Sequence, residues 1–275
     1  MIARIISPQT LYQNLDHPDW VIVDCRFDLE EETEGEREYK QAHIPRAIYM
    51  NLERDLSGME GKVGGRHPLP DLSTFTQLLG ECGINHEKHV VIYDNHGGMF
   101  AVRLWWMLSY VGHEEVSLLD EGYEGWCQKG YPITEEEPYY EPTTFVPTLQ
   151  DHMLVERKEV EESIGNQPII DARAPERFRG EEESLDPRAG HIPGAINHFW
   201  KNNLEEGQRW KCEEQLQSEY SYLSSMSEPI VYCGSGVTAC ANIFAMKRAG
   251  IEGARLYVGS WSEWSRNDTL PVERE

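Results

Sequence analysis

The sequence is poor in basic residues and has no long apolar run. Its 275 residues include 25 Lys and Arg against 48 Asp and Glu, a formal net charge of −23. Such an excess of negative charge argues against binding to nucleic acid or to an anionic membrane surface. No stretch approaches the ~18 apolar residues of a transmembrane helix, and the first residues lack the apolar core of a signal peptide. We therefore expect a cytoplasmic protein without nucleic-acid or membrane partners.

The cysteines lack the spacing of a disulfide framework or a metal site. All 6 are irregularly placed, and none forms a Cys-x-x-Cys pair. In a chain of this length without a signal peptide, this pattern favours reduced thiols. His86 and His89 lie three residues apart without further ligands nearby in the sequence. Because a metal site needs a fuller set of ligands, we expect no metal and no cofactor.

The sequence does contain an internal repeat. Four short segments recur in the same order: 21–26 as 168–173, 42–48 as 190–196, 91–94 as 230–233, and 122–126 as 259–264 with one extra residue. Apolar runs typical of buried strands alternate with helical patterns in both copies. Repeated alternation of this kind predicts an α/β fold with two tandem domains, each a mostly parallel sheet flanked by helices.

The expected boundaries follow from the repeat and from proline. Four X-Pro pairs between 131 and 147 break any regular element, which predicts an extended linker. The domains are then 1–133 and 151–275, with the linker at 134–150. The expected strands are 20–26, 89–94, 116–119 and 230–232, and the expected helices are 75–82, 100–111 and 239–248.

Cys233 is the best candidate nucleophile. It follows the apolar run 230–232, and a glycine-rich turn leads from it into the expected helix 239–248. Gly234 and Gly236 allow successive backbone N–H groups to point at one atom, and a helix N-terminus adds partial positive charge. A sulfur there would be stabilised as thiolate. In parallel sheets, ligands also bind beyond the carboxyl ends of strands, which is where Cys233 falls.

The segment Cys-Gly-Ser-Gly-Val-Thr-Ala at 233–239 resembles the active-site loop of rhodanese-type sulfurtransferases, in the version of 3-mercaptopyruvate sulfurtransferases. The resemblance implies transfer of sulfur from 3-mercaptopyruvate, through a Cys233 persulfide, to a thiol, cyanide or a thioredoxin-like protein. Thiosulfate is the alternative donor on the same cysteine. A non-catalytic binding module is the alternative of another class. Asp94 occupies the cysteine position in the first copy and cannot carry sulfur, so the first domain should be non-catalytic.

The resemblance also implies roles for individual residues. Arg177 and Arg188 would bind the donor carboxylate and carbonyl, and their alternative is ion pairing with the acidic run 181–186. His43 and Ser235 would transfer protons, with an acidic partner for His43 among 30–34; a structural His43 is the alternative, since His191 occupies the same turn. Arg66 and His67 lie on a long loop, which we interpret as solvated; the alternative is that this loop forms a rim of the binding cleft. The donor would be bound by the loop residues Gly234, Ser235, Gly236, Val237 and Thr238.

Two sequence features bear on rival chemistries. A Cys-x5-Arg phosphatase needs an arginine six residues after the cysteine to clamp the oxyanion, and here that position is Ala239. Thiosulfate-preferring members of the family carry basic residues directly after the cysteine. Gly234 and Ser235 are neutral at these positions, which favours 3-mercaptopyruvate as the donor.

Overall fold

The computed structural model describes residues 3–61, 63–224, 226 and 228–275. By its contacts the chain divides into two compact units, the first made of 1–58, 70–150 and 204–210, and the second of 59–69, 151–203 and 211–275. The expected boundaries differ from this division at three places. Residues 59–69 pack with the second unit, 204–210 pack with the first, and the expected linker 134–150 is counted with the first.

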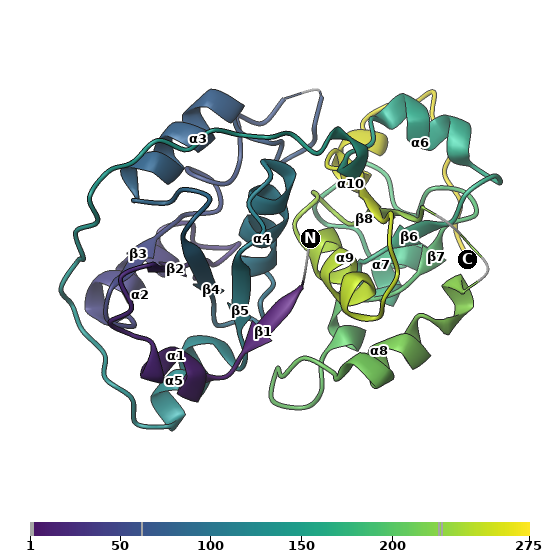
Figure 1. Cartoon of the computed structure of the whole chain (residues 1–275). Coiled ribbons are helices and arrows are strands. Elements are labelled where there is room, and N and C mark those ends of the chain that lie inside the picture. The colour runs from purple at the N-terminus through teal and green to yellow at the C-terminus, as the bar shows by residue number, and fades with distance from the viewer. Residues whose placement is uncertain (1–2, 62, 225, 227) are drawn as a thin grey trace. The chain divides into compact units, whose positions relative to one another are not determined.

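Over its described residues, the first unit contains a parallel sheet of five strands in the order β1-β5-β4-β2-β3. Helices flank this sheet (Figure 1). Leu11 of α1 and Trp126 of α5 pack against the strand residues Ile22 and Val91. The elements are β1 (Arg4–Ile6), α1 (Pro8–Gln13), β2 (Trp20–Asp24), α2 (Glu34–Gln41), β3 (Ala47–Tyr49), α3 (Leu72–Glu81), β4 (His89–Tyr93), α4 (Ala101–Tyr110), β5 (Val116–Leu119) and α5 (Gly122–Gln128).

The second unit repeats this design with four parallel strands over the part of the chain described, in the order β7-β6-β8-β9. Its helices again pack around the sheet (Figure 1). The elements are η1 (Asp151–Met153), α6 (Arg157–Ser163), β6 (Ile169–Asp171), α7 (Pro175–Arg179), β7 (Ile196–Asn197), η2 (Trp200–Asn203), α8 (Glu213–Glu219), η3 (Ser221–Leu223), β8 (Ile230–Tyr232), α9 (Ala239–Arg248), β9 (Arg255–Leu256) and α10 (Ser260–Trp264).

The strand order places two loops side by side at one edge of the second sheet. β6 and β8 are neighbours, and Asp171 pairs with Tyr232 at their carboxyl ends. The chain leaves β6 toward β7 on one side and returns as β8 on the other, so the direction of strand order reverses between them. Crevices at such reversal points are where open α/β sheets bind ligands. The residues after Asp171 and Tyr232 are therefore in position to form a site.

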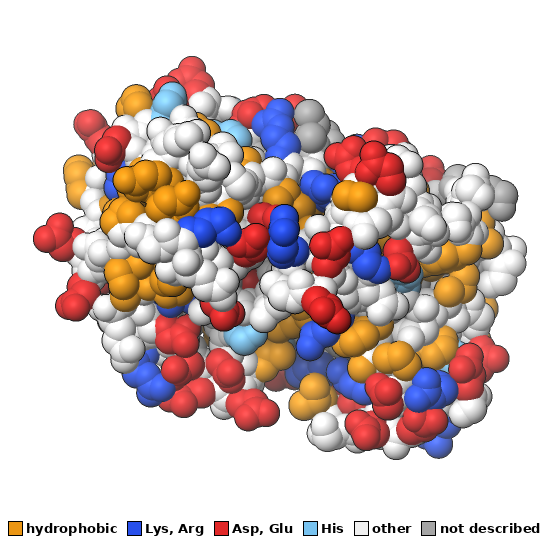
Figure 2. All heavy atoms as spheres, turned by 90° about the horizontal axis from the view of Figure 1, so that it is seen from below, with side chains coloured by type: hydrophobic (Ala, Val, Ile, Leu, Met, Phe, Trp, Pro, Cys, Tyr) orange, Lys and Arg blue, Asp and Glu red, His pale blue; other side chains and the backbone are white. Residues whose placement is uncertain are grey.

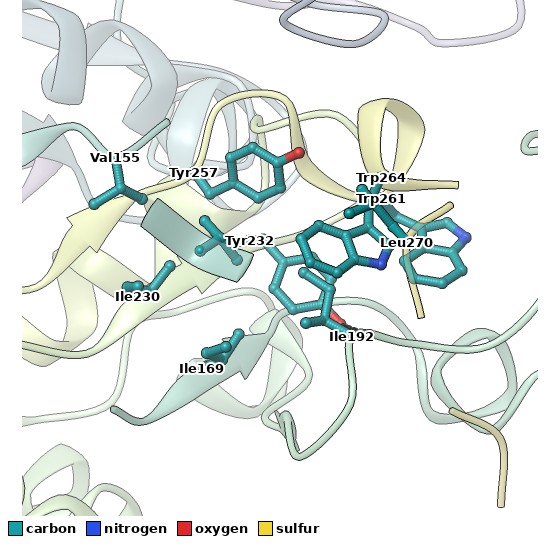
Figure 3. Close-up of a cluster of buried hydrophobic side chains, with 10 residues drawn as sticks. Val155, Ile169, Ile192, Ile230, Tyr232, Tyr257, Trp261, Trp264 and Leu270 are labelled. Carbon is teal, nitrogen blue, oxygen red and sulfur yellow. Dashed lines mark hydrogen bonds between the residues drawn. The ribbon is translucent and has the colours of Figure 1, made fainter. Parts of the chain in front are cut away.

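A cluster of buried aromatic and aliphatic side chains supports the strand that carries Cys233. Tyr232 of β8 belongs to the same cluster as Trp261 and Trp264 of α10, and all three are fully buried (Figure 3). Burying large aromatic side chains contributes a major part of the stability of a domain. This packing fixes α10 against the end of β8, which matters for the loop that follows. The cluster is Val155, Val160, Ile169, Ile192, Ile230, Tyr232, Tyr257, Trp261, Trp264 and Leu270.

Acidic side chains are spread over the face drawn in Figure 2, with fewer basic ones among them. No helix among the residues that the structure describes is both long and apolar enough to cross a membrane. An anionic ligand of this protein must therefore be attracted by a local group of basic residues, against the field of the whole molecule.

Candidate active site

Cys233 lies at the carboxyl end of β8, where its backbone is held by the start of α10. Its N–H donates to Oγ of Ser260 at 3.1 Å, and its carbonyl accepts from the N–H of Trp261 at 3.0 Å. Gly234 is held in the same way, because its carbonyl accepts from the N–H of Ser262 at 2.9 Å. Cys233 is only 2% exposed. The predicted nucleophile thus sits on a fixed and nearly buried loop.

The loop curls back onto the sulfur, as the glycine pattern predicts. The N–H of Gly236 donates to Sγ of Cys233 at 3.1 Å. Gly236 has φ +80°, and a methyl group there would lie 2.5 Å from the carbonyl oxygen of Val258, so only glycine fits. Val237 is buried beside it. Thr238 precedes α9 and makes no side-chain capping bond to it.

Ser235 is paired with a histidine, and that histidine is His67. Nδ1 of His67 lies 2.6 Å from Oγ of Ser235, and both side chains are buried. His67 is only 5% exposed, so the interpretation of a solvated loop is wrong. A signal was present in the sequence: the glycines before Arg66 allow close backbone approach. A methyl group at Gly65 would lie 2.5 Å from the carbonyl oxygen of Gly259.

The expected role of His43 is not supported by its surroundings. His43 lies in the first unit, and both of its ring nitrogens face backbone carbonyls of that same unit. Its Nδ1 lies 2.7 Å from the carbonyl oxygen of Tyr39, and its Nε2 lies 3.1 Å from that of Glu136. With both ring nitrogens facing backbone carbonyls, neither is available to exchange a proton with a serine. The structural alternative describes His43 better.

Two arginines lie over Gly234. A methyl group built at Gly234 would lie 3.2 Å from Nη2 of Arg66 and 3.3 Å from Nη1 of Arg177. Sequence reasoning proposed Arg177 and missed Arg66, whose segment 59–69 reaches this unit from far away along the chain. The backbone N–H of Arg66 donates to Oγ of Ser262 at 3.0 Å, which ties this segment to α10. We call Arg66 and Arg177 the arginine pair.

Both members of the arginine pair donate hydrogen bonds to acidic side chains. Nη2 of Arg177 donates to both carboxylate oxygens of Glu183, at 2.8 and 2.9 Å, and to Oδ2 of Asp186 at 3.2 Å. Arg66 donates to Oδ1 of Asp186. Burial raises the pKa of the Asp186 carboxyl, and the charge of Arg66 opposes that shift. Ion pairing with the acidic run is thus real for Arg177, and the same pairs aim its guanidinium at the cysteine loop.

Arg188 is placed differently from the expectation. Its guanidinium donates to main-chain carbonyls of the last residue of α10 and of the segment that follows, at 2.6 to 2.9 Å. The acceptors are the carbonyl oxygens of Trp264, Ser265, Asn267 and Leu270. The side chain therefore stabilises the turn that follows α10. Because Nε, Nη1 and Nη2 of Arg188 all donate to these carbonyls, the expectation that Arg188 binds the donor is corrected to a structural role.

The repeated sheet and loop correspond to a known domain family. A family model described as a rhodanese-like domain matches residues 7–129 and again residues 156–267. The chain belongs to the rhodanese-like domain family. Both predicted copies are thereby confirmed, and so is the α/β fold of two such domains.

Relatives of similar length carry sulfurtransferase names. A probable 3-mercaptopyruvate sulfurtransferase from Pseudomonas aeruginosa is 42% identical over 98% of this chain and 98% of its own length. A thiosulfate sulfurtransferase from Gallus gallus is 33% identical over 88% of this chain and 85% of its own. A solved 3-mercaptopyruvate sulfurtransferase from Leishmania major aligns with TM-score 0.85 and 28% identity, covering 98% of this chain and 76% of that one.

Proposed function

We propose that this rhodanese-like protein transfers sulfur from 3-mercaptopyruvate to a thiophilic acceptor through a persulfide on Cys233. The enzyme class is confirmed by relatives named 3-mercaptopyruvate and thiosulfate sulfurtransferases that span nearly the whole chain. The observation that carries the residue assignment is the sulfur of Cys233 facing the N–H of Gly236 at 3.1 Å. An inward-pointing N–H group stabilises a thiolate before transfer and a persulfide anion after it.

The chemistry divides into two steps. The Cys233 thiolate attacks the thiol sulfur of 3-mercaptopyruvate and forms an S–S bond, while the bond from that sulfur to carbon breaks. The electron pair of the broken bond forms the enolate of pyruvate, which takes up a proton on carbon. The proton that the donor thiol loses balances the one taken up. In the second step a thiol, cyanide or a thioredoxin-like protein attacks the outer sulfur and restores the thiolate.

Ser235 and His67 are suited to the proton transfers of the first step. Their 2.6 Å hydrogen bond joins a hydroxyl next to the cysteine loop to an imidazole, the side chain that exchanges protons most readily near neutral pH. The hydroxyl can donate toward the developing enolate oxygen while His67 supplies or receives the proton behind it. We assign to His67 the role that sequence reasoning gave to His43.

The arginine pair is suited to hold the donor. A planar guanidinium binds a carboxylate with two parallel hydrogen bonds, and Arg66 and Arg177 both lie over Gly234. Nε of Arg177 is buried without a hydrogen-bond partner among the described residues. The donor carboxylate would replace some of the hydrogen bonds that the arginine pair makes to Glu183 and Asp186.

Thiosulfate is the second candidate donor. Two arginines suit a dianion, and relatives named thiosulfate sulfurtransferases match most of the chain. Gly234 and Ser235 favour 3-mercaptopyruvate, because they add no positive charge next to the cysteine. We also propose that the first domain, 1–133, is non-catalytic, that 134–150 links it to the catalytic domain 151–275, and that the protein works in the cytoplasm.

The test is steady-state sulfur transfer to cyanide with 3-mercaptopyruvate and thiosulfate side by side. A higher kcat/KM for 3-mercaptopyruvate supports the proposal. A preference for thiosulfate would keep the enzyme class and overturn the donor assignment. Absence of transfer from either donor would return the non-catalytic binding module to first place.

A further inference from the structure

The charges around the cysteine loop are balanced. Three arginines and three carboxylates form one connected group, so its positive and negative formal charges are equal in number. Among the residues that the structure describes, this group therefore adds no net positive charge to a site that is proposed to bind an anionic donor. The group consists of Arg66, Arg173, Arg177, Asp171, Glu183 and Asp186.

Glu183 and Asp171 stabilise the loops on which they lie, because both carboxylates accept hydrogen bonds from backbone N–H groups. Asp171 accepts from the guanidinium and the backbone N–H of Arg173. Glu183 accepts from the backbone N–H groups of Leu185 and Asp186, at 3.0 and 3.1 Å, besides its bonds to Arg177. Both carboxylates thus shape the loops on which they lie. Their removal would disturb the fold of those loops together with the charge.

Asp186 differs because each of its oxygens meets one member of the arginine pair. Oδ1 accepts from Arg66 and Oδ2 accepts from Arg177 at 3.2 Å. Its side chain is 0% exposed, so water screens its charge poorly. Asp186 therefore places a poorly screened negative charge in direct contact with both arginines that are proposed to bind the donor.

Resting on the proposed function, we propose that Asp186 is a specificity-determining residue that makes the arginine pair select a donor with one negative charge over a donor with two. 3-Mercaptopyruvate brings one carboxylate to the pair, and thiosulfate brings two charges. Each charge on the donor is repelled by the Asp186 carboxylate in a site of low dielectric constant. The repulsion is larger for the dianion, while any effect of Asp186 on the Cys233 thiolate is common to both donors.

The experiment compares wild type with Asp186→Asn, which keeps the shape and removes the charge. Steady-state transfer to cyanide is measured for both donors. We expect the kcat/KM ratio of thiosulfate to 3-mercaptopyruvate to rise about tenfold, mainly through a lower KM for thiosulfate. Asp186→Glu, which keeps the charge, should return the ratio toward the wild-type value. An unchanged or lower ratio, or an equal loss for both donors, would overturn the proposal.

Two further measurements keep the test decisive. If Asp186→Asn does not fold, Arg66→Gln leaves one excess negative charge in the group and should move the ratio in the opposite direction. If wild type transfers sulfur from neither donor, the proposed function fails while Asp186 can still be tested by calorimetry. Sulfate should then gain affinity over pyruvate in Asp186→Asn by about tenfold, and equal changes for the two anions would contradict the role of Asp186.

Discussion

Asp94 and Cys233 occupy equivalent positions in the two repeats. In both loops backbone N–H groups point at the side chain of this residue, a carboxylate in the first repeat and a thiol in the second. Both residues follow a central strand. The carbonyl of Asp94 accepts from the N–H of Tyr123 at the start of α5, and the carbonyl of Cys233 accepts from the N–H of Trp261 at the start of α10. In the first unit the Asp94 carboxylate accepts four backbone N–H bonds of 2.7 to 2.9 Å. In the second, the N–H of Gly236 points at a sulfur.

Under the proposed function, the difference shows how one loop design yields a structural element in one repeat and a reactive site in the other. In the first repeat, four backbone donors are satisfied by a buried side chain of the loop itself, so the loop has few donors left for a ligand. In the second repeat the acceptor is a thiol, which can bind and release a sulfur atom. Substitutions in the second loop and its surroundings should therefore affect sulfur transfer, whereas a substitution in the first loop should affect stability.

The largest effect should come from the acceptor of the second loop. Cys233→Ser replaces the sulfur by a hydroxyl that cannot form a persulfide, so sulfur transfer should fall by at least about a thousandfold. The measurement is kcat/KM with either donor. Cys127→Ser, at an exposed cysteine, is the matched control and should retain full activity. Activity retained by Cys233→Ser would refute the assignment of the carrier.

A smaller loss is expected at the histidine that contacts the loop serine. His67→Gln removes the proton-exchanging group next to Ser235, and kcat with 3-mercaptopyruvate should fall about a hundredfold. With thiosulfate the loss should be smaller, because the leaving sulfite needs no proton on carbon. His43→Gln is the matched histidine in the first unit and should leave kcat unchanged. A larger loss at His43 than at His67 would reverse the roles of the two histidines.

Substitutions of the two arginines proposed from the sequence should have different effects, one on donor binding and the other on stability. Arg177→Ala should raise the KM for 3-mercaptopyruvate about tenfold, because a guanidinium over Gly234 is lost. Arg188→Ala should leave KM nearly unchanged and lower the thermal midpoint, because several carbonyl acceptors after α10 lose their donor. Equal KM effects from the two substitutions would return Arg188 to the binding site.

The smallest effect on activity should come from the first loop. Asp94→Ala leaves four backbone N–H groups without their acceptor, and it should lower the free energy of unfolding by at least about 2 kcal/mol. Sulfur transfer at a temperature where the variant is folded should be unchanged. Denaturant unfolding and kinetics measure the two quantities, and Asp16→Ala, at an exposed residue, is the control. A large loss of transfer would show that the first domain takes part.

The parts of the fold predicted best are those encoded by neighbouring residues. The predicted strands at 116–119 and 230–232 and the helix at 239–248 have the observed bounds. The Cys233 loop was predictable because Gly236 has φ +80°, a local backbone conformation that favours glycine. Short apolar runs and glycine turns report on local conformation, so they could be interpreted without knowing the distant partners.

The parts that were missed depend on distant segments. His67 lies 168 positions from Ser235, and the glycines before Arg66 indicate a close backbone approach without revealing which distant segment makes it. Arg188 bonds to carbonyls more than 70 positions away, which no spacing rule reveals. The repeat indicates a structural role for His43, because His191 occupies the equivalent turn in the second unit. His43 and His191 each hold Nδ1 2.7 Å from a backbone carbonyl and stack on an aromatic ring, a pairing that serves the fold in both units.

The central claim is that the second loop carries sulfur and the first does not. The most direct measurement is peptide mass spectrometry after brief treatment with 3-mercaptopyruvate without acceptor, under conditions that preserve persulfides. We predict a gain of one sulfur atom on the peptide containing Cys233, its loss when cyanide is added, and no such gain in Cys233→Ser. A labile sulfur on another cysteine, with Cys233 unmodified, would contradict this claim.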